Sequence, residues 1–152
     1  MIKTEFLQEL DPDLKALKER DWEEYDSKHG AHFNYKTFAV VLKDDTGEVA
    51  GAVEGYTIYD EVYIDDFWVH SKHRGRGYGT GLMRAIEDEF RGKGFNNMNL
   101  CTSHFQAPEF YKKCGFTLEF IRENAKNPKL SKYFFVKFFD DEEHKQGLLD
   151  SN

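Results

Sequence analysis

The segment over residues 69–82 restricts the possible folds more than any other part of the chain. Its centre, Arg74 to Gly79, reads Arg-Gly-Arg-Gly-Tyr-Gly and lies between an apolar strand pattern and an amphipathic helix pattern. Glycine lets the backbone take positive φ values and approach a ligand closely. A helix N-terminus offers unpaired N–H groups to phosphate, and arginine adds charge-assisted donors. The pattern therefore predicts a strand–turn–helix unit whose turn binds a pyrophosphate.

The glycine spacing argues against two other phosphate-binding turns. A dinucleotide-binding turn has Gly-x-Gly-x-x-Gly directly after the strand, but Thr80 and Leu82 stand where the third glycine would lie. A P-loop carries Gly-Lys-Ser/Thr, which this segment lacks. A plain flexible loop is an alternative, although it does not account for two arginines directly before a helix.

Periodicity and turn residues predict one domain over residues 1–140 and an acidic, frayed tail over residues 141–152. Asp11-Pro12-Asp13 predicts the start of a helix that ends near His29-Gly30. The further elements are expected as strands at 37–43, 48–59 and 61–69, a helix at 79–90, a strand at 97–102, a short helix at 107–113, and strands at 116–122 and 131–140. An antiparallel meander followed by a helical crossover indicates the α+β class with a mixed sheet.

Composition limits the classes of partner. The formal net charge of −7 argues against nucleic acid, because nucleic-acid-binding proteins usually carry a basic face. No apolar run reaches membrane-spanning length, and the N-terminus lacks a signal-peptide pattern. Two cysteines do not form a disulfide framework. We therefore expect a cytoplasmic protein that has no membrane or nucleic-acid partner.

Three ordered segments resemble the GNAT family of N-acetyltransferases. Arg74 to Gly79 matches the family's Arg/Gln-x-x-Gly-x-Gly/Ala motif for acetyl-CoA, Ile64 to Val69 resembles the strand before it, and Phe110 to Phe116 resembles its Phe-Tyr-x-x-x-Gly-Phe segment. Together they cover residues 62–118. The chain departs from the family near the N-terminus, where one helix is predicted in a region that commonly has two.

The resemblance implies a GNAT-like fold: a mixed, mostly antiparallel sheet of six to seven strands flanked by helices, of the α/β three-layer type. It also implies acetyl-CoA as co-substrate, held where the strands at 61–69 and 97–102 splay apart. Strand residues would pair with the pantetheine amides and turn residues would bind the pyrophosphate. These residues are Phe67, Trp68, Val69, Arg74, Gly75, Arg76, Gly77, Tyr78, Gly79 and Thr80.

Two residues carry the chemistry that the resemblance implies. Tyr111 matches the tyrosine with which many relatives protonate the leaving thiolate, and a phenol near pKa 10 is close to a thiol near 8.5. Asp65 aligns with a glutamate of polyamine acetyltransferases. Direct proton abstraction by an aspartate from an ammonium would cost roughly 9 kcal/mol, so Asp65 is expected to act through a water or to orient the amine. A solvated or structural carboxylate is the alternative. Because side chains alternate along a strand, only one of Asp65 and Asp66 should face the cleft.

The acceptor side is predicted from aromatic and acidic residues. Trp22 and Tyr25 lie on the first helix, in a region that lines acceptor sites in relatives, and Tyr63 should share a face with Asp65. An ordinary amphipathic helix is the alternative for the first two. His70 and His73 flank the arginine turn, but no third ligand stands near them in sequence, so no metal site is predicted.

The expected function is therefore acetyl-CoA-dependent N-acetylation of a primary amine by direct attack in a ternary complex. The acceptor is expected to be a small cationic amine. A protein or peptide N-acetyltransferase and a non-catalytic acyl-CoA-binding module are the alternatives. Relatives often dimerise through C-terminal strands, so residues 133–139, which are rich in aromatics, suit either a homodimer contact or the core.

Overall fold

The structure is a computed structural model that describes residues 1–139. The chain divides into two units, Met1–Asn34 and the part from Tyr35 onward. The tail predicted over residues 141–152 lies outside the described residues, and the single-domain boundaries stay a prediction. No helix within residues 1–139 is both long enough and apolar enough to span a bilayer.

The first unit holds helix α1, Pro12–Lys28. Asp11 is its N-cap, with a side-chain oxygen 2.9 Å from the backbone N of Leu14. Proline at the first position and an acid in the first turn complete the predicted start. The helix stops at His29, and Gly30 follows with φ of 68°. The sequence prediction for this helix is confirmed at both ends.

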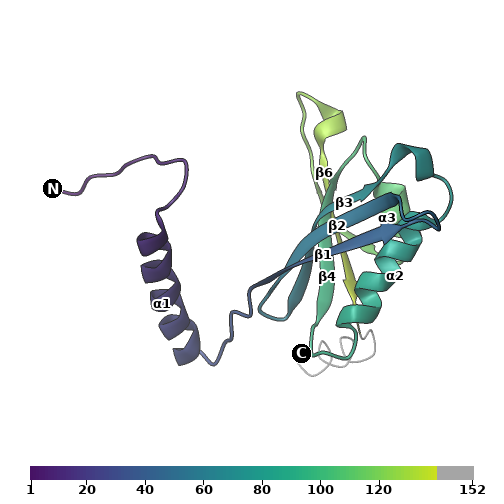
Figure 1. The fold of residues 1–152 in the computed structure, drawn as a ribbon. Coiled ribbons are helices and arrows are strands. Elements are labelled where there is room, and N and C mark those ends of the chain that lie inside the picture. The colour runs from purple at the N-terminus through teal and green to yellow at the C-terminus, as the bar shows by residue number, and fades with distance from the viewer. Residues whose placement is uncertain (140–152) are drawn as a thin grey trace, which may run out of the picture. The chain divides into compact units, whose positions relative to one another are not determined.

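The second unit is a six-stranded sheet in the order β1-β2-β3-β4-β6-β5 (Figure 1). All pairs are antiparallel except β3 with β4. The mixed α+β class is confirmed, with six strands. The strands are β1 (Lys36–Lys43), β2 (Val49–Ile58), β3 (Glu61–Val69), β4 (Asn97–Ser103), β5 (Thr117–Arg122) and β6 (Lys132–Phe138).

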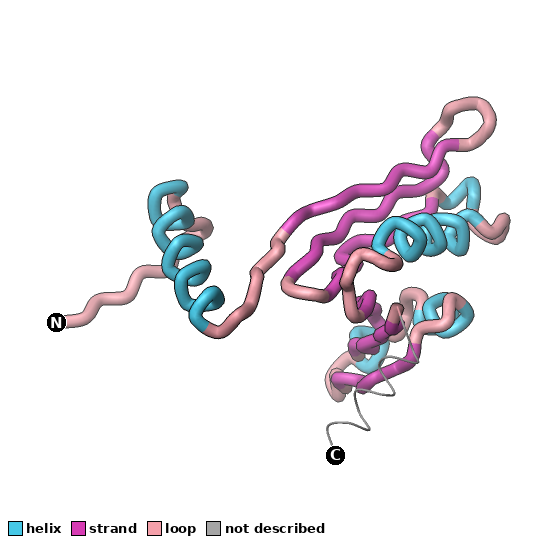
Figure 2. The backbone as a smooth tube through the Cα atoms, turned by 90° about the horizontal axis from the view of Figure 1, so that it is seen from below, coloured by secondary structure: helices cyan, strands magenta, loops and turns pink. Residues whose placement is uncertain are grey.

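Two α-helices pack on the sheet through one core. Helix α2 (Tyr78–Phe90) runs along strands β1 to β3 (Figures 1 and 2) and buries three side chains, Leu82, Met83 and Ile86. Helix α3 (Pro108–Lys113) adds Tyr111 to the same core. Two short 3-10 helices, η1 (Ser71–His73) and η2 (Pro128–Leu130), complete the described elements. The helix α2 predicted from the spacing of apolar residues is confirmed, whereas η1 and η2 were not predicted.

Strands β3 and β4 separate after a short parallel pairing. The pairing runs from Glu61 with Asn97 to Ile64 with Leu100, although β3 continues to Val69 and β4 to Ser103. Beyond that point β3 remains paired with β2, while β4 remains paired with β6. Within the described residues, the β4-facing edge of β3 after Ile64 therefore has no strand partner.

A β-bulge interrupts β3 where it leaves β4. Glu54 pairs with Asp66 and Gly55 pairs with Ile64, so Asp65 is the extra residue. Gly55 is required there, because a Cβ would lie 2.4 Å from the carbonyl oxygen of Tyr63. The bulge also shifts the alternation of the strand, so that Phe67 packs against the same core as Ile64. The bulge therefore breaks the regular alternation that was assumed from sequence for this strand, and the expectation that only one of Asp65 and Asp66 faces the cleft stays a prediction.

Candidate functional site

The glycine turn is an open backbone segment at the start of α2. Gly75 and Gly77 have φ values of 76° and 82°, and a Cβ at either would meet no atom within 4 Å. Gly77 is the N-cap of α2 and has no side-chain hydrogen bond that caps the helix. The first N–H groups of a helix have no partner within the helix. The turn therefore presents free donors and the positive end of the α2 dipole to open space.

Some residues of the turn hold it in place, and the side chains of others are exposed to solvent. Arg74 donates from Nε to the carbonyl oxygen of Val69 at 3.1 Å, which ties the turn to the end of β3. Gly79 packs closely against Phe110, since a Cβ there would lie 3.0 Å from that ring. Arg76 and Thr80 are exposed beside the glycines. An incoming anion can thus meet both backbone donors and an exposed guanidinium.

The three strand residues predicted for donor binding lie on the unpaired part of β3. Phe67 packs 5.5 Å from the Phe110 ring, measured between centroids, and Trp68 is exposed. Tyr78, at the start of α2, contacts the ring of His73 at 5.5 Å between centroids. The predicted strand edge and the predicted turn are therefore adjacent, because β3 leads into η1 and then into the turn.

Tyr111 is buried behind this edge. Its side chain is 7% exposed, and its ring lies 6.1 Å from both Phe67 and Phe135 between centroids. Burial is the main cause that raises the pKa of Tyr111 to about 12, with smaller contributions from Cys114 and Asp66. The hydroxyl therefore stays protonated at physiological pH, as a hydrogen-bond donor should.

The two aspartates of the bulge influence different tyrosines. Burial, then the charge of Asp65, raises the pKa of Tyr56. The pKa of Tyr63 is raised by burial first, with Asp65 contributing the least. Tyr56 and Tyr63 pair across β2 and β3 with ring centroids 5.0 Å apart. The charge of Asp65 thus contributes to the raised pKa values of Tyr56 and Tyr63, and the charge of Asp66 contributes to the raised pKa of Tyr111.

The predicted acceptor residues fall in both units. Tyr63 lies in the sheet, whereas Trp22 and Tyr25 lie on α1, where their rings make an edge-on contact at 5.6 Å between centroids. Both rings of α1 are more than half exposed. Roles for Trp22, Tyr25 and Tyr63 in binding an acceptor stay predictions.

Sequence reasoning missed several residues beside the site. Tyr56 is placed by strand register, and Phe110, which the sequence indicated only as part of its motif, is placed by the contact between α3 and α2. The short turn near Asp60 was the available signal for Tyr56, because it sets Tyr56 opposite Tyr63. Asp44 and Glu48 were missed as neighbours of His73, which they reach from the β1–β2 turn. Hydrogen bonds from Thr46 hold the pKa of Asp44 below its usual range.

Comparison with known proteins identifies relatives over most of the chain. The sequence profile described as the acetyltransferase (GNAT) family matches residues 4–116. The blasticidin-S acetyltransferase of Streptomyces morookaense is 33% identical over 55% of this chain and 62% of that protein. The streptothricin acetyltransferase of Streptomyces lavendulae is also 33% identical, over 60% of this chain and 49% of that protein. The chain thus matches less than two thirds of the length of these curated relatives.

Solved structures are similar to this chain over a larger share of its length. An acetyltransferase from Bacillus cereus is 26% identical, with a TM-score of 0.70 over 88% of this chain and 97% of that chain. An aminoglycoside 6'-N-acetyltransferase complexed with coenzyme A is 20% identical, with a TM-score of 0.61 over 92% of this chain and 98% of that chain. The second likeness concerns the fold alone.

Proposed function

The chain belongs to the acetyltransferase (GNAT) family, and we propose that it transfers the acetyl group of acetyl-CoA to a primary amine. The amine attacks the thioester carbonyl directly while both substrates are bound. A C–N bond forms, the C–S bond breaks, and a proton passes from nitrogen to sulfur. The products are an N-acetylated amine and free CoA thiol.

One observation carries this proposal: an open glycine turn follows directly on an unpaired strand edge. Gly75 and Gly77 leave space in front of the α2 N-terminus, and β3 beyond Ile64 has no strand partner on its β4 side within the described residues. A pyrophosphate suits the first feature, and an extended chain with amide groups suits the second, as in strand addition. Acetyl-CoA contains both parts in that order, so the residues present fit it.

The proposed roles follow from these positions. The N–H groups from Arg74 to Thr80 bind the pyrophosphate, and Phe67 to Val69 bind the pantetheine arm. Tyr111 donates a hydrogen bond or a proton to the leaving sulfur, because burial keeps its hydroxyl protonated. Asp65 orients the amine or accepts its proton through a water. The exposed position of Asp65 in the bulge supports this role.

We propose a small cationic amine as acceptor. The two curated relatives are named for blasticidin S and streptothricin, and the net charge of −7 favours a cation. Tyr63 of the sheet is proposed to bind it, and the roles predicted for Trp22 and Tyr25 of the first unit stay predictions.

Calorimetric titration with acetyl-CoA tests the donor. We expect saturable binding of one molecule per chain, followed by release of CoA thiol when a suitable amine is added. The absence of binding at high micromolar acetyl-CoA would contradict the proposal. The amine panel should contain polyamines, aminoglycosides, blasticidin S, streptothricin, and peptides with free lysine or N-terminal amines.

The same panel separates the two alternative functions. Turnover of peptides alone would indicate a protein or peptide N-acetyltransferase. Tight binding of acetyl-CoA without thiol release on any amine would indicate a non-catalytic acyl-CoA-binding module.

A further inference from the structure

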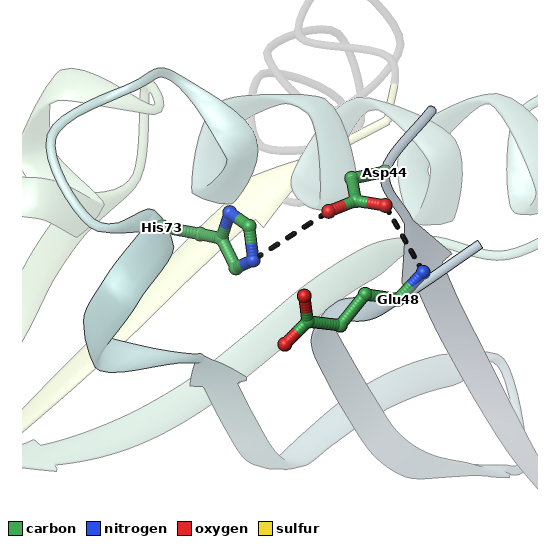
Figure 3. A group of neighbouring side chains, drawn as sticks. All are labelled: Asp44, Glu48 and His73. Atoms are coloured by element: carbon green, nitrogen blue, oxygen red, sulfur yellow. Dashed lines mark hydrogen bonds and ion pairs between the residues drawn. The ribbon is translucent and has the colours of Figure 1, made fainter. Parts of the chain in front are cut away.

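A second group of chemically active side chains lies beside the glycine turn. Asp44 and Glu48 come from the turn that joins β1 and β2, and His73 is the last residue of η1. One ligand atom from each lies within 4.8 Å of the others (Figure 3). We propose that these three side chains bind a divalent transition-metal ion, of which Zn²⁺ matches the donor set best.

His73 is the residue that most needs a partner. It is 7% exposed, and both ring nitrogens are buried without a hydrogen-bond partner. A buried polar atom that lacks a partner is costly and rare in native proteins. Nε2 faces Asp44, with 3.8 Å between Nε2 and Oδ2. A metal ion between these two atoms would give Nε2 a partner while the histidine stays neutral.

Asp44 is held in the orientation that a ligand requires. Its Oδ1 atom accepts hydrogen bonds from the N–H and hydroxyl of Thr46, at 2.9 and 2.6 Å, and from the N–H of Glu48 at 3.0 Å. These bonds occupy one carboxylate oxygen and leave Oδ2 directed at His73 (Figure 3). Hydrogen bonds of this kind position the ligands of known metal sites.

Glu48 supplies the third ligand atom, a carboxylate oxygen, from the solvent side. Its carboxylate is half exposed and makes an ion pair with Lys72 at 3.4 Å. Exposed ion pairs contribute little to stability, so a metal ion can displace Lys72. Lys72 is the cation next to the group, and the ring of His70 lies 6.0 Å from that of His73 between centroids.

The donor set selects the type of ion. Ca²⁺ and Mg²⁺ favour sites made of oxygen alone, whereas one imidazole and two carboxylates suit Zn²⁺. Bond lengths near 2.1 Å place the ligand atoms of a tetrahedral site about 3.4 Å apart. The separation of 3.8 Å between His73 and Asp44 is therefore close to that of a bound site. Three protein ligands leave one position for water.

The ion would join two segments that are distant in sequence. It would connect the β1–β2 turn to the residue directly before Arg74 and thereby hold the start of the glycine turn. It takes no part in the acetyl transfer proposed above, and the inference does not rest on that function.

Titration of the tag-free, metal-stripped full chain with Zn²⁺ tests the site. We expect one ion per chain with micromolar affinity by calorimetry, a higher melting temperature, and a visible absorption band when Co²⁺ replaces Zn²⁺. His73→Gln and Glu48→Gln should each weaken binding at least about tenfold. Glu48 is exposed, so its variant is expected to fold even if His73→Gln does not.

Two matched controls make the test specific. Asp45→Asn removes the neighbouring acid of the same turn, and His29→Ala removes an exposed histidine of the first unit. Both should bind Zn²⁺ as the wild type does. The proposal fails if the wild type shows no saturable binding, or if His73→Gln and Glu48→Gln both keep wild-type affinity.

Discussion

At the scale of single residues, Tyr111 shows how burial changes a proposed role. From sequence alone its phenol is compared with a thiol about 1.5 pKa units lower. Burial raises the pKa of Tyr111 to about 12. The difference becomes about 3.5 units, so full proton transfer to a free thiolate costs roughly 5 kcal/mol. Tyr111 is therefore better suited to hydrogen-bond the departing sulfur, while the proton comes finally from the amine.

Replacing Tyr111 by Phe tests this role. We expect kcat to fall about 10- to 100-fold because the sulfur loses its donor, while the Kd for acetyl-CoA stays within about twofold. Tyr59→Phe is the control, since Tyr59 is an exposed turn residue. Unchanged kcat in a folded Tyr111→Phe protein would remove Tyr111 from the mechanism.

The raised pKa of Tyr111 should be measurable as a loss of unfolding free energy at alkaline pH. The folded pKa of about 12 lies above the ordinary value of 10.0, so the folded state binds the proton more tightly. Its contribution to stability is complete below pH 10 and is lost as the pH rises toward 12. Relative to Tyr111→Phe, the wild type should lose about 1.4 kcal/mol of unfolding free energy by pH 11. Urea unfolding of both proteins at pH 8 and pH 11 measures this; a pH-independent difference would contradict it.

At the scale of elements, α2 combines the donor site with the sheet. Its N-terminus opens at the glycine turn. Near its other end, Glu87 accepts a hydrogen bond from Lys137 of β6 at 2.9 Å. Lys137 also donates to the carbonyl oxygen of Cys114 at 2.9 Å, where α3 ends. One lysine thus connects the two helices and the sheet.

Gly75→Ala tests the N-terminal end of α2. The new methyl would project into the space assigned to the pyrophosphate, so we expect the Kd for acetyl-CoA to rise about tenfold or more. Gly92→Ala is the matched control, because Gly92 has the same φ of 76° and equally open surroundings after α2. Both should lose about 1–2 kcal/mol of stability. An equal change in Kd for the two variants would argue against the assigned site.

Lys137→Met tests the contacts near the C-terminal end of α2. It removes Lys137 from the mostly buried Glu87, which keeps its ion pair with Arg91, and it also removes the hydrogen bond to the Cys114 carbonyl oxygen. We therefore expect about 2 kcal/mol less stability. Lys93→Met breaks an exposed ion pair with Glu89 and should cost under about 0.5 kcal/mol. Urea unfolding compares the two, and similar losses would show that the Lys137 contacts contribute little.

At the scale of the whole molecule, the net charge should affect how strongly the protein attracts a cationic acceptor. The net charge of −7 should concentrate cationic amines near the protein, and this attraction weakens as salt shortens the Debye length. Raising the ionic strength from about 0.02 to 0.5 M should increase the KM of a diamine several-fold. A monoamine of equal length should respond less, and equal responses would exclude steering by charge.

Homodimer formation also stays a prediction. Phe135 and Val136, which belong to the segment considered for a homodimer contact, are core residues.

The sequence by itself determined the strands, the α-helices and the motifs that indicate the family. The cap at Asp11, the alternation in the strands and the helical spacing after Gly79 are local signals, because a helix or strand depends mainly on residues a few positions apart. The turn at Arg74 to Gly79 was predicted for the same reason: its glycines act through the backbone of the residues that carry them. Family membership then followed from the order of three such motifs and is confirmed.

Only the tertiary structure decided what these elements bring together. The bulge at Asp65 depends on how β2 pairs with β3, and the raised pKa of Tyr111 depends on the rings that exclude water from it. His73 meets Asp44 across 28 intervening positions. Each of these properties arises from atoms of distant segments at contact range. Electrostatics and desolvation act through space, so no local pattern in the chain could have predicted them.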